Sequence, residues 1–139
     1  MKDIKLYDVL VCEDVRNEVG GQHTIIGLVS ELNVHLKKDH KGSVIIPLSF
    51  MFRLTNLKEN MKLDGFHIRI FDSKNNKIEK TILLNQNEIN KHFNIVLKKV
   101  LINLKETTEL SFEIQAKDKN GKSHIIDKNY KFTIHLLKK

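Results

Sequence analysis

Apolar and polar residues alternate with a period of two in four separate stretches of this chain. Residues 48–54, 66–70, 112–116 and 132–136 each carry an apolar residue at every second position, with mostly polar side chains between them. Successive side chains of a strand point to opposite faces, so this pattern predicts strands with one buried face. No segment repeats apolar residues at helical spacing over a long stretch.

Two further stretches, 77–84 and 93–104, predict strands with a less regular pattern. In residues 93–104 the apolar positions are first Phe93, Ile95 and Leu97, and then shift to the opposite parity from Val100 onward. A shift of one position indicates an extra residue in the strand. We therefore expect a bulge at Lys98 and Lys99, or a break between two strands.

Turn-forming residues separate these stretches. Gly20-Gly21 and residues 72–76 each divide two strand-like segments, and Asn120-Gly121 is the pair favoured in a type I′ hairpin turn. Residues 85–91 are compatible with one helical turn. The pattern as a whole predicts an all-β protein: a single antiparallel β-sandwich of about eight strands that occupies residues 1–139 as one domain.

Composition narrows the class of protein. The 139 residues suffice for a core, and the apolar share of 40% is ordinary for a globular protein. No apolar run approaches the roughly 18 residues of a membrane span, and the first residues lack the features of a signal peptide. The single cysteine cannot form an internal disulfide. We therefore expect a cytoplasmic protein with no membrane contact.

The formal net charge of +7 raises the question of nucleic acid binding. Residues 1–30 sum to −2, residues 31–90 to +3 and residues 91–139 to +6. A basic C-terminal third attracts anionic partners, but net charge alone carries no specificity. Of the 24 basic residues, 21 are lysine, and lysines on exposed strand faces also serve solubility.

The stretch VLVCEDVR, residues 9–16, holds the densest chemistry in the chain. An extended backbone places Cys12, Asp14 and Arg16 on one face and Glu13 on the other, so the two carboxylates diverge. A nucleophilic cysteine needs a base, and the nearest histidine in the sequence is His23. The neighbouring acid opposes thiolate formation, which favours a small buried Cys12 instead.

An ion pair between Asp14 and Arg16 is the alternative interpretation, with the pair bracing the first strand against the Gly20-Gly21 turn. The seven histidines form no metal-binding spacing, and no phosphate-binding or nucleophile motif is present. Gly27 indicates a bulge or a close backbone approach rather than a phosphate loop. We therefore expect no cofactor, no metal and no catalytic residue.

Residues 11–30, VCEDVRNEVGGQHTIIGLVS, resemble the opening signature of an uncharacterised bacterial β-sandwich family, a domain of unknown function. The matching positions are Cys12, Glu13, Asp14, Arg16, Glu18, Gly20, Gly21 and Gly27. The resemblance implies a small stand-alone sandwich of immunoglobulin-like general form. It implies no activity, substrate or cofactor.

The function expected from these observations is a non-catalytic interaction module that binds a protein partner. The alternative is a module that binds nucleic acid or a phosphorylated ligand through residues 91–139. The partner and the oligomeric state stay open. The candidate binding residues are Glu13, Asp14, Arg16, His23, Lys98 and Lys99.

Overall fold

Ten strands and no helix make up the described part of the chain, which in this computed structural model is residues 4–18, 23–56, 63–72, 74, 77–83, 92–127 and 130–138. In chain order the strands are β1 (Ile4–Asn17), β2 (His23–Val29), β3 (Leu32–Leu36), β4 (Val44–Asn56), β5 (Leu63–Phe71), β6 (Lys77–Leu83), β7 (His92–Leu104), β8 (Thr108–Asp118), β9 (Ser123–Asp127) and β10 (Lys131–Lys138). The all-β prediction is confirmed.

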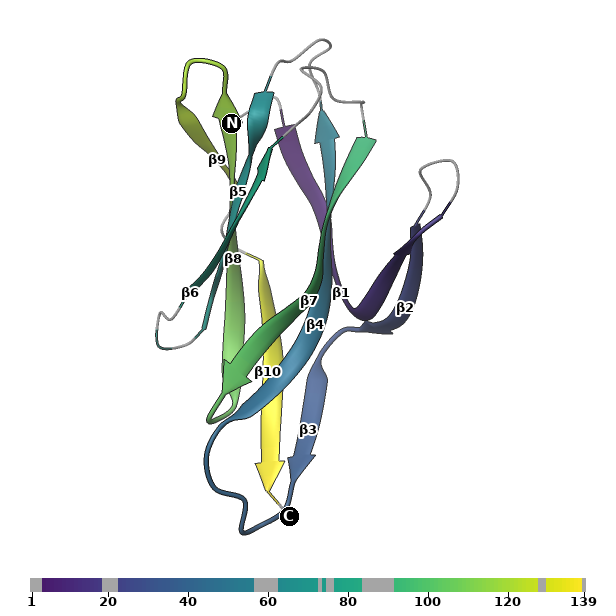
Figure 1. The fold of residues 1–139 in the computed structure, drawn as a ribbon, viewed down its shortest axis with the longest axis vertical. Helices are drawn as coiled ribbons and strands as arrows, with labels where there is room; N and C mark the ends of the chain where they lie inside the picture. Colours follow the sequence, from purple (N-terminus) through teal and green to yellow (C-terminus); the bar gives the residue numbers. More distant parts are fainter. Residues whose placement is uncertain are drawn as a thin grey trace.

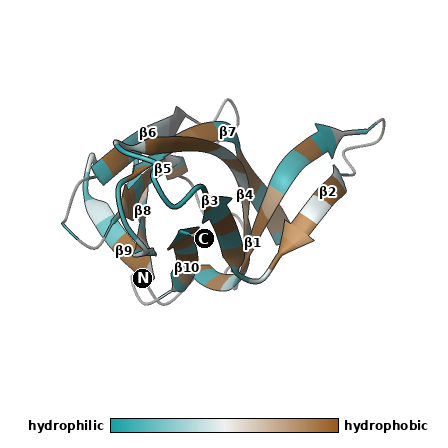
Figure 2. Ribbon diagram, turned by 90° about the horizontal axis from the view of Figure 1, so that it is seen from below, coloured by the Kyte–Doolittle hydropathy of each residue, from teal (hydrophilic) through white to brown (hydrophobic). Residues whose placement is uncertain are grey.

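The strands form two sheets that pack together (Figure 1). The first sheet has the order β2-β1-β4-β7, and the second has the order β3-β10-β8-β5-β6, with β9 paired to β8 beyond the part that pairs with β10. The β1–β2 hairpin projects away from the rest of the molecule (Figure 2). Among the described strands β2 and β7 are the outer strands of the first sheet and β3 and β6 those of the second, so each of these four has one unpaired edge.

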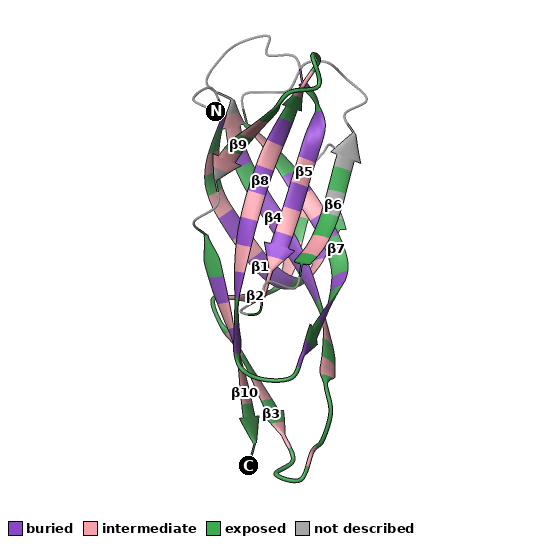
Figure 3. Cartoon of the chain, turned by 90° about the vertical axis from the view of Figure 1, so that its left-hand side faces the viewer, coloured by how far each residue is buried: buried purple, intermediate pink, exposed green. Residues whose placement is uncertain are grey.

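The alternating residues of the sequence form the core between the sheets. Phe50 and Phe52 of β4 meet Phe112 of β8 edge to face, at ring-centroid distances of 5.5 Å and 5.9 Å. Buried and less buried positions alternate along β5 and β8, as Figure 3 shows. Tyr130, just before β10, donates a hydrogen bond of 3.0 Å from its hydroxyl to the Val9 carbonyl of β1 and so ties the second sheet to the first.

Two parts of the fold prediction are wrong. The described residues form ten strands rather than about eight, and they include a short strand at residues 32–36, β3, that no pattern predicted. The sandwich is not wholly antiparallel either, since β3 runs parallel to β10, with Ile134 opposite Leu32. After β2 the chain passes from the first sheet to the second, where β3 pairs with β10. Parallel pairing of segments so distant in sequence leaves no local signal.

The predicted bulge in residues 93–104 is confirmed. Leu48 pairs with Val100 but Phe50 pairs with Leu97, so Lys98 and Lys99 together lie opposite Ser49. Lys99 has a φ of 51°, the left-handed conformation that a bulged residue can adopt.

The hairpin at Asn120-Gly121 is confirmed, but its predicted turn type is wrong. A type I′ turn requires a positive φ at both central residues, and of these two only Gly121 has one, at 82°. The Asp118 carboxylate accepts hydrogen bonds from the Asn120 and Lys122 amides, at 2.9 and 3.0 Å. This side chain favours a longer turn that closes with Gly121. The predicted turn at Gly20-Gly21 and the helical turn at 85–91 lie outside the described residues.

Candidate functional site

Cys12 lies fully buried on the outer side of the first sheet, in a small apolar cluster with Val15 and Met51. Its Sγ lies 3.6 Å from the Ser49 carbonyl oxygen. Burial raises the pKa of the Cys12 thiol, and the Asp14 charge raises it further, while Lys99 partly opposes both. The thiol is therefore held in its protonated form and packs as a small apolar group.

A hydrogen-bond network that spans three strands holds the bulge of β7 beside Cys12. Ser49, which is completely buried, donates from its hydroxyl to the Glu13 carbonyl at 3.3 Å and accepts from the Lys99 amide at 3.0 Å. The Lys99 Nζ donates to the same Glu13 carbonyl at 3.0 Å. The network joins β1, β4 and β7, and it satisfies the amide that the bulge frees from regular pairing.

Two of the predicted site residues, Glu13 and Lys99, are thus brought together, but the contact uses the Glu13 backbone. The Glu13 side chain is exposed and lies over Gly27 of β2, where an added Cβ would come within 2.6 Å of the Glu13 Cγ. Gly27 has a φ of 67°. The prediction for Gly27 was a bulge or a close backbone approach, but the group that lies close is the Glu13 side chain, and the β1–β2 register shows no shift here. The positive φ explains why a glycine stands at this position.

The remaining predicted residues do not converge. The Asp14 carboxylate accepts the Val15 amide at 2.9 Å, and the ion pairs of the described residues do not include the predicted pair with Arg16. β1 and β2 pair as expected, yet His23 lies opposite Asn17, five positions along the strand from Cys12. At about 3.3 Å per residue that places the two roughly 16 Å apart along the hairpin.

The predicted division of faces in residues 11–16 is also wrong in part, because Val15 packs in the same cluster as Cys12. The pairing of β1 with β4 ends at Cys12, so only β2 supports the strand beyond it. A two-stranded ribbon twists more strongly than a strand held on both sides. Strict alternation therefore does not predict the environment of residues past Cys12.

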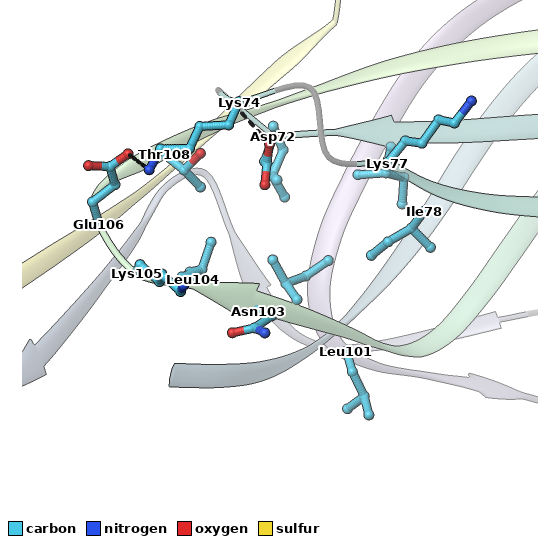
Figure 4. Close-up of a pocket in the computed structure, with 13 residues that line it drawn as sticks. Asp72, Lys74, Lys77, Ile78, Leu101, Asn103, Leu104, Lys105, Glu106 and Thr108 are labelled. Carbon is cyan, nitrogen blue, oxygen red and sulfur yellow. Dashed lines mark hydrogen bonds and ion pairs between the residues drawn. The ribbon is translucent and has the colours of Figure 1, made fainter. Parts of the chain in front are cut away.

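A groove of about 430 Å³ lies between β7 and the β5–β6 hairpin (Figure 4). Its mouth is crossed by an ion pair between Lys74 and Glu106, with 3.3 Å between Nζ and Oε1. The apolar residues that line the groove come from both sheets and are Ile70, Ile78, Leu101, Ile102, Leu104 and Leu110. A groove of this volume with an apolar floor is within the range of binding sites.

This groove follows the unpaired edge of β7 rather than one of its faces. Five consecutive residues, 101–105, all line it, although successive side chains of a strand point in opposite directions. Leu101 points to the outer side with 62% of its surface exposed, whereas Ile102 is buried in the core. Ile45 of the adjacent β4 is 59% exposed, and its pairing with Asn103 places it diagonally from Leu101. Apolar side chains therefore lie along this edge on both faces of the sheet, the outer face and the face toward the core.

Sequence reasoning missed both Ser49 and this groove. Ser49 occupies a polar position of an alternating strand, which predicts exposure, and only its place opposite the bulge distinguishes it. The basic residues of the C-terminal third are dispersed. Lys98 and Lys99 lie on β7, Lys105 follows it, and Lys119 lies in the turn at the other end of β8.

No protein-family model and no curated protein matches the chain. Among solved structures, the X-ray structure of Northeast Structural Genomics Consortium target SoR45 is similar at 12% sequence identity, with a TM-score of 0.48 over 96% of this chain and 87% of that one. The described residues include no group of His, Cys, Asp or Glu placed to hold a metal ion. They also include no helix of the length and apolar character needed to cross a bilayer.

Proposed function

We propose that this chain is a non-catalytic interaction module that binds a protein partner along the free edge of β7. The proposal includes a β-sandwich of immunoglobulin-like general form, membership of the family that residues 11–30 resemble, and a cytoplasmic location. The observation that carries it is the groove, because residues 101–105 combine an unpaired strand edge with apolar side chains on both sides.

An unpaired edge offers a row of amides and carbonyls to an extended segment of another protein, and flanking pockets receive its alternate side chains. The β7 edge supplies both features. Exposed Leu101 and Ile45 also form an apolar surface that solvent disfavours. In contrast, Cys12 is buried and the described pairing places it far from His23, so this proposal gives Cys12 a packing role and no catalytic one.

A photo-crosslinking amino acid placed at position 101 in the native cell tests the proposal. Leu28 is the matched control, since it is also a leucine with 62% exposure but lies on β2, at the opposite edge of the same sheet. A partner identified at position 101 and then purified should bind the Leu28→Asp variant like the wild type. It should bind the Leu101→Asp variant about tenfold more weakly or worse.

Three outcomes would overturn the proposal. One is the absence of any adduct at position 101, and a second is equal adducts at both positions. The third is that the purified chain turns over a substrate. Binding of DNA and RNA at 50 mM salt, measured by fluorescence anisotropy, would instead support the alternative of a nucleic acid module, with affinity falling steeply as salt is added.

A further inference from the structure

We infer that the segment bound at the β7 edge is an extended apolar stretch with acidic residues at both ends. The inference rests on the proposed function and specifies the chemistry of the partner. Beyond the bulge, the edge consists of Val100–Leu104, five residues without a charge. Lys98 and Lys99 precede this stretch and Lys105 follows it. This uncharged stretch, apolar except for Asn103, is therefore bounded by lysine at each end.

The ammonium groups at the two ends are available to a ligand. Lys98 and Lys105 are exposed, and neither takes part in an ion pair among the described residues. Lys99 is exposed too, but its Nζ is already bound to the Glu13 carbonyl. Lys74 is paired with Glu106 across the groove, and both side chains are more than half exposed, so this ion pair is weak and opens at little cost.

A second copy of this chain is a poor occupant of the same edge. Antiparallel pairing of two Val100–Leu104 segments is centred on Ile102, because that register alone aligns the uncharged residues with one another. It places Lys99 of each copy opposite Lys105 of the other, at both ends of the added pairing. Like charges placed directly opposite one another destabilise a strand pair. The bulge at Lys98 and Lys99 also interrupts the regular geometry of β7 next to this stretch.

The apolar character of the partner follows from the two sides of the edge. Alternate side chains of an added strand would point into the groove, toward Ile102 and Leu104 on one wall and Ile78 on the other. The side chains between them would lie beside Leu101 on the outer side. A strand that is apolar on both sides therefore fits best, and carboxylates at its ends reach Lys98 and Lys105.

Peptide binding to the full chain tests this inference. The probe is a fluorescein-labelled peptide with the core Val-Leu-Ile-Leu-Val, which is apolar on both sides, and two glutamates at each end; its matched control has lysines in place of the glutamates. At low salt each carboxylate–lysine contact should contribute about fivefold in affinity, as an exposed ion pair does. The acidic peptide should therefore bind about 25-fold more tightly than the basic one, with the difference shrinking as salt rises.

Protein variants assign the binding to the edge. Lys98→Glu and Lys105→Glu should each weaken binding of the acidic peptide by about fivefold or more, whereas Lys119→Glu, a charge reversal in the β8–β9 turn, should not. Leu101→Asp should abolish binding and Leu28→Asp should leave it intact. N-methylation of alternate peptide amides should also abolish it, since strand addition uses the peptide backbone.

Equal binding of the acidic and basic peptides would overturn the inference, as would equal binding of the N-methylated peptide or an effect of Leu28→Asp as large as that of Leu101→Asp. The inference would also be overturned if the chain dimerised at micromolar concentration and Leu101→Asp made it monomeric, because the edge would then bind a second copy of this chain. The proposed function is judged separately, by the cross-link at position 101. A specific cross-link without preference for acidic peptides would retain the proposed function and refute the acidic partner.

Discussion

Replacing Ser49 by alanine should destabilise the protein far more than the loss of one small polar group suggests. The hydroxyl of Ser49 bonds both the Glu13 carbonyl of β1 and the Lys99 amide of β7, and the side chain is fully buried. Alanine would leave the Lys99 amide without this acceptor, beside a position that is itself fully buried. We therefore expect the Ser49→Ala variant to loosen the junction of three strands.

The size of the effect follows from the two hydrogen bonds. Each contributes about 1 kcal/mol net, and an unsatisfied buried group costs roughly 1–3 kcal/mol. The free energy of unfolding should therefore fall by about 2 kcal/mol, which for a chain of this length lowers Tm by about 8 °C. Lys99→Gly should cost less, because glycine relieves the positive φ of the bulge while the Nζ bond to Glu13 is lost.

Urea unfolding followed by far-UV circular dichroism measures both variants, with an unchanged m-value as the sign of an unaltered two-state transition. Ser111→Ala is the matched control. Ser111 is half-buried on β8, and its side chain forms no hydrogen bond among the described residues, so this change should stay within about 0.5 kcal/mol. A Ser49→Ala effect as small as that of Ser111→Ala would refute the role assigned to the network.

Three further predictions concern other parts of the fold. Cys12 should resist iodoacetamide at neutral pH in the native protein and react once it is unfolded in urea, because burial raises its pKa; rapid labelling of the native protein would contradict this. Gly27→Ala should lower the free energy of unfolding by about 1–2 kcal/mol, because the new Cβ meets the Glu13 side chain and the positive φ strains an alanine. Adding Glu13→Ala should restore only part of this loss, since it removes the steric clash but leaves the positive φ. Full restoration would exclude backbone strain. The hydrogen bond from His124, together with those from the turn amides, lowers the pKa of the Asp118 carboxyl group. The ionised carboxylate therefore stabilises the fold above about pH 4, and this contribution is lost as the pH falls through the lower folded-state pKa. The difference in the free energy of unfolding between wild type and Asp118→Ala should be smaller at pH 3 than at pH 7, and a constant difference would disprove the linkage.

Local patterns predicted the features that depend on neighbours in sequence. The change of parity between Leu97 and Val100 located the bulge, because one extra residue reverses which side chains face the core. The glycine at position 27 indicated a bulge or a close backbone approach, whereas the group that lies close is the Glu13 side chain. The hairpin at Asn120-Gly121 was expected as well, although the Asp118 carboxylate selected a different turn.

Features that join distant segments were not predictable in this way. Ser49 looks like an exposed residue on an alternating strand, and its burial depends on β1 and β7 lying on either side of β4. The parallel pairing of β3 with β10 joins residues about a hundred positions apart. Whether Cys12 and His23 could meet depended on the hairpin register, which places them at different positions along the strands.

The sequence by itself determined that this protein is built of strands, which side chains fill its core, and where one strand bulges, because these properties follow from side-chain alternation over a few residues. Only the tertiary structure decided the order of the strands and therefore which edges stay unpaired. The groove exists because β7 ends one sheet and β6 ends the other, with aliphatic residues of both sheets between them. Its binding chemistry is a property of that arrangement, since no continuous stretch of the chain contains all the residues that line it.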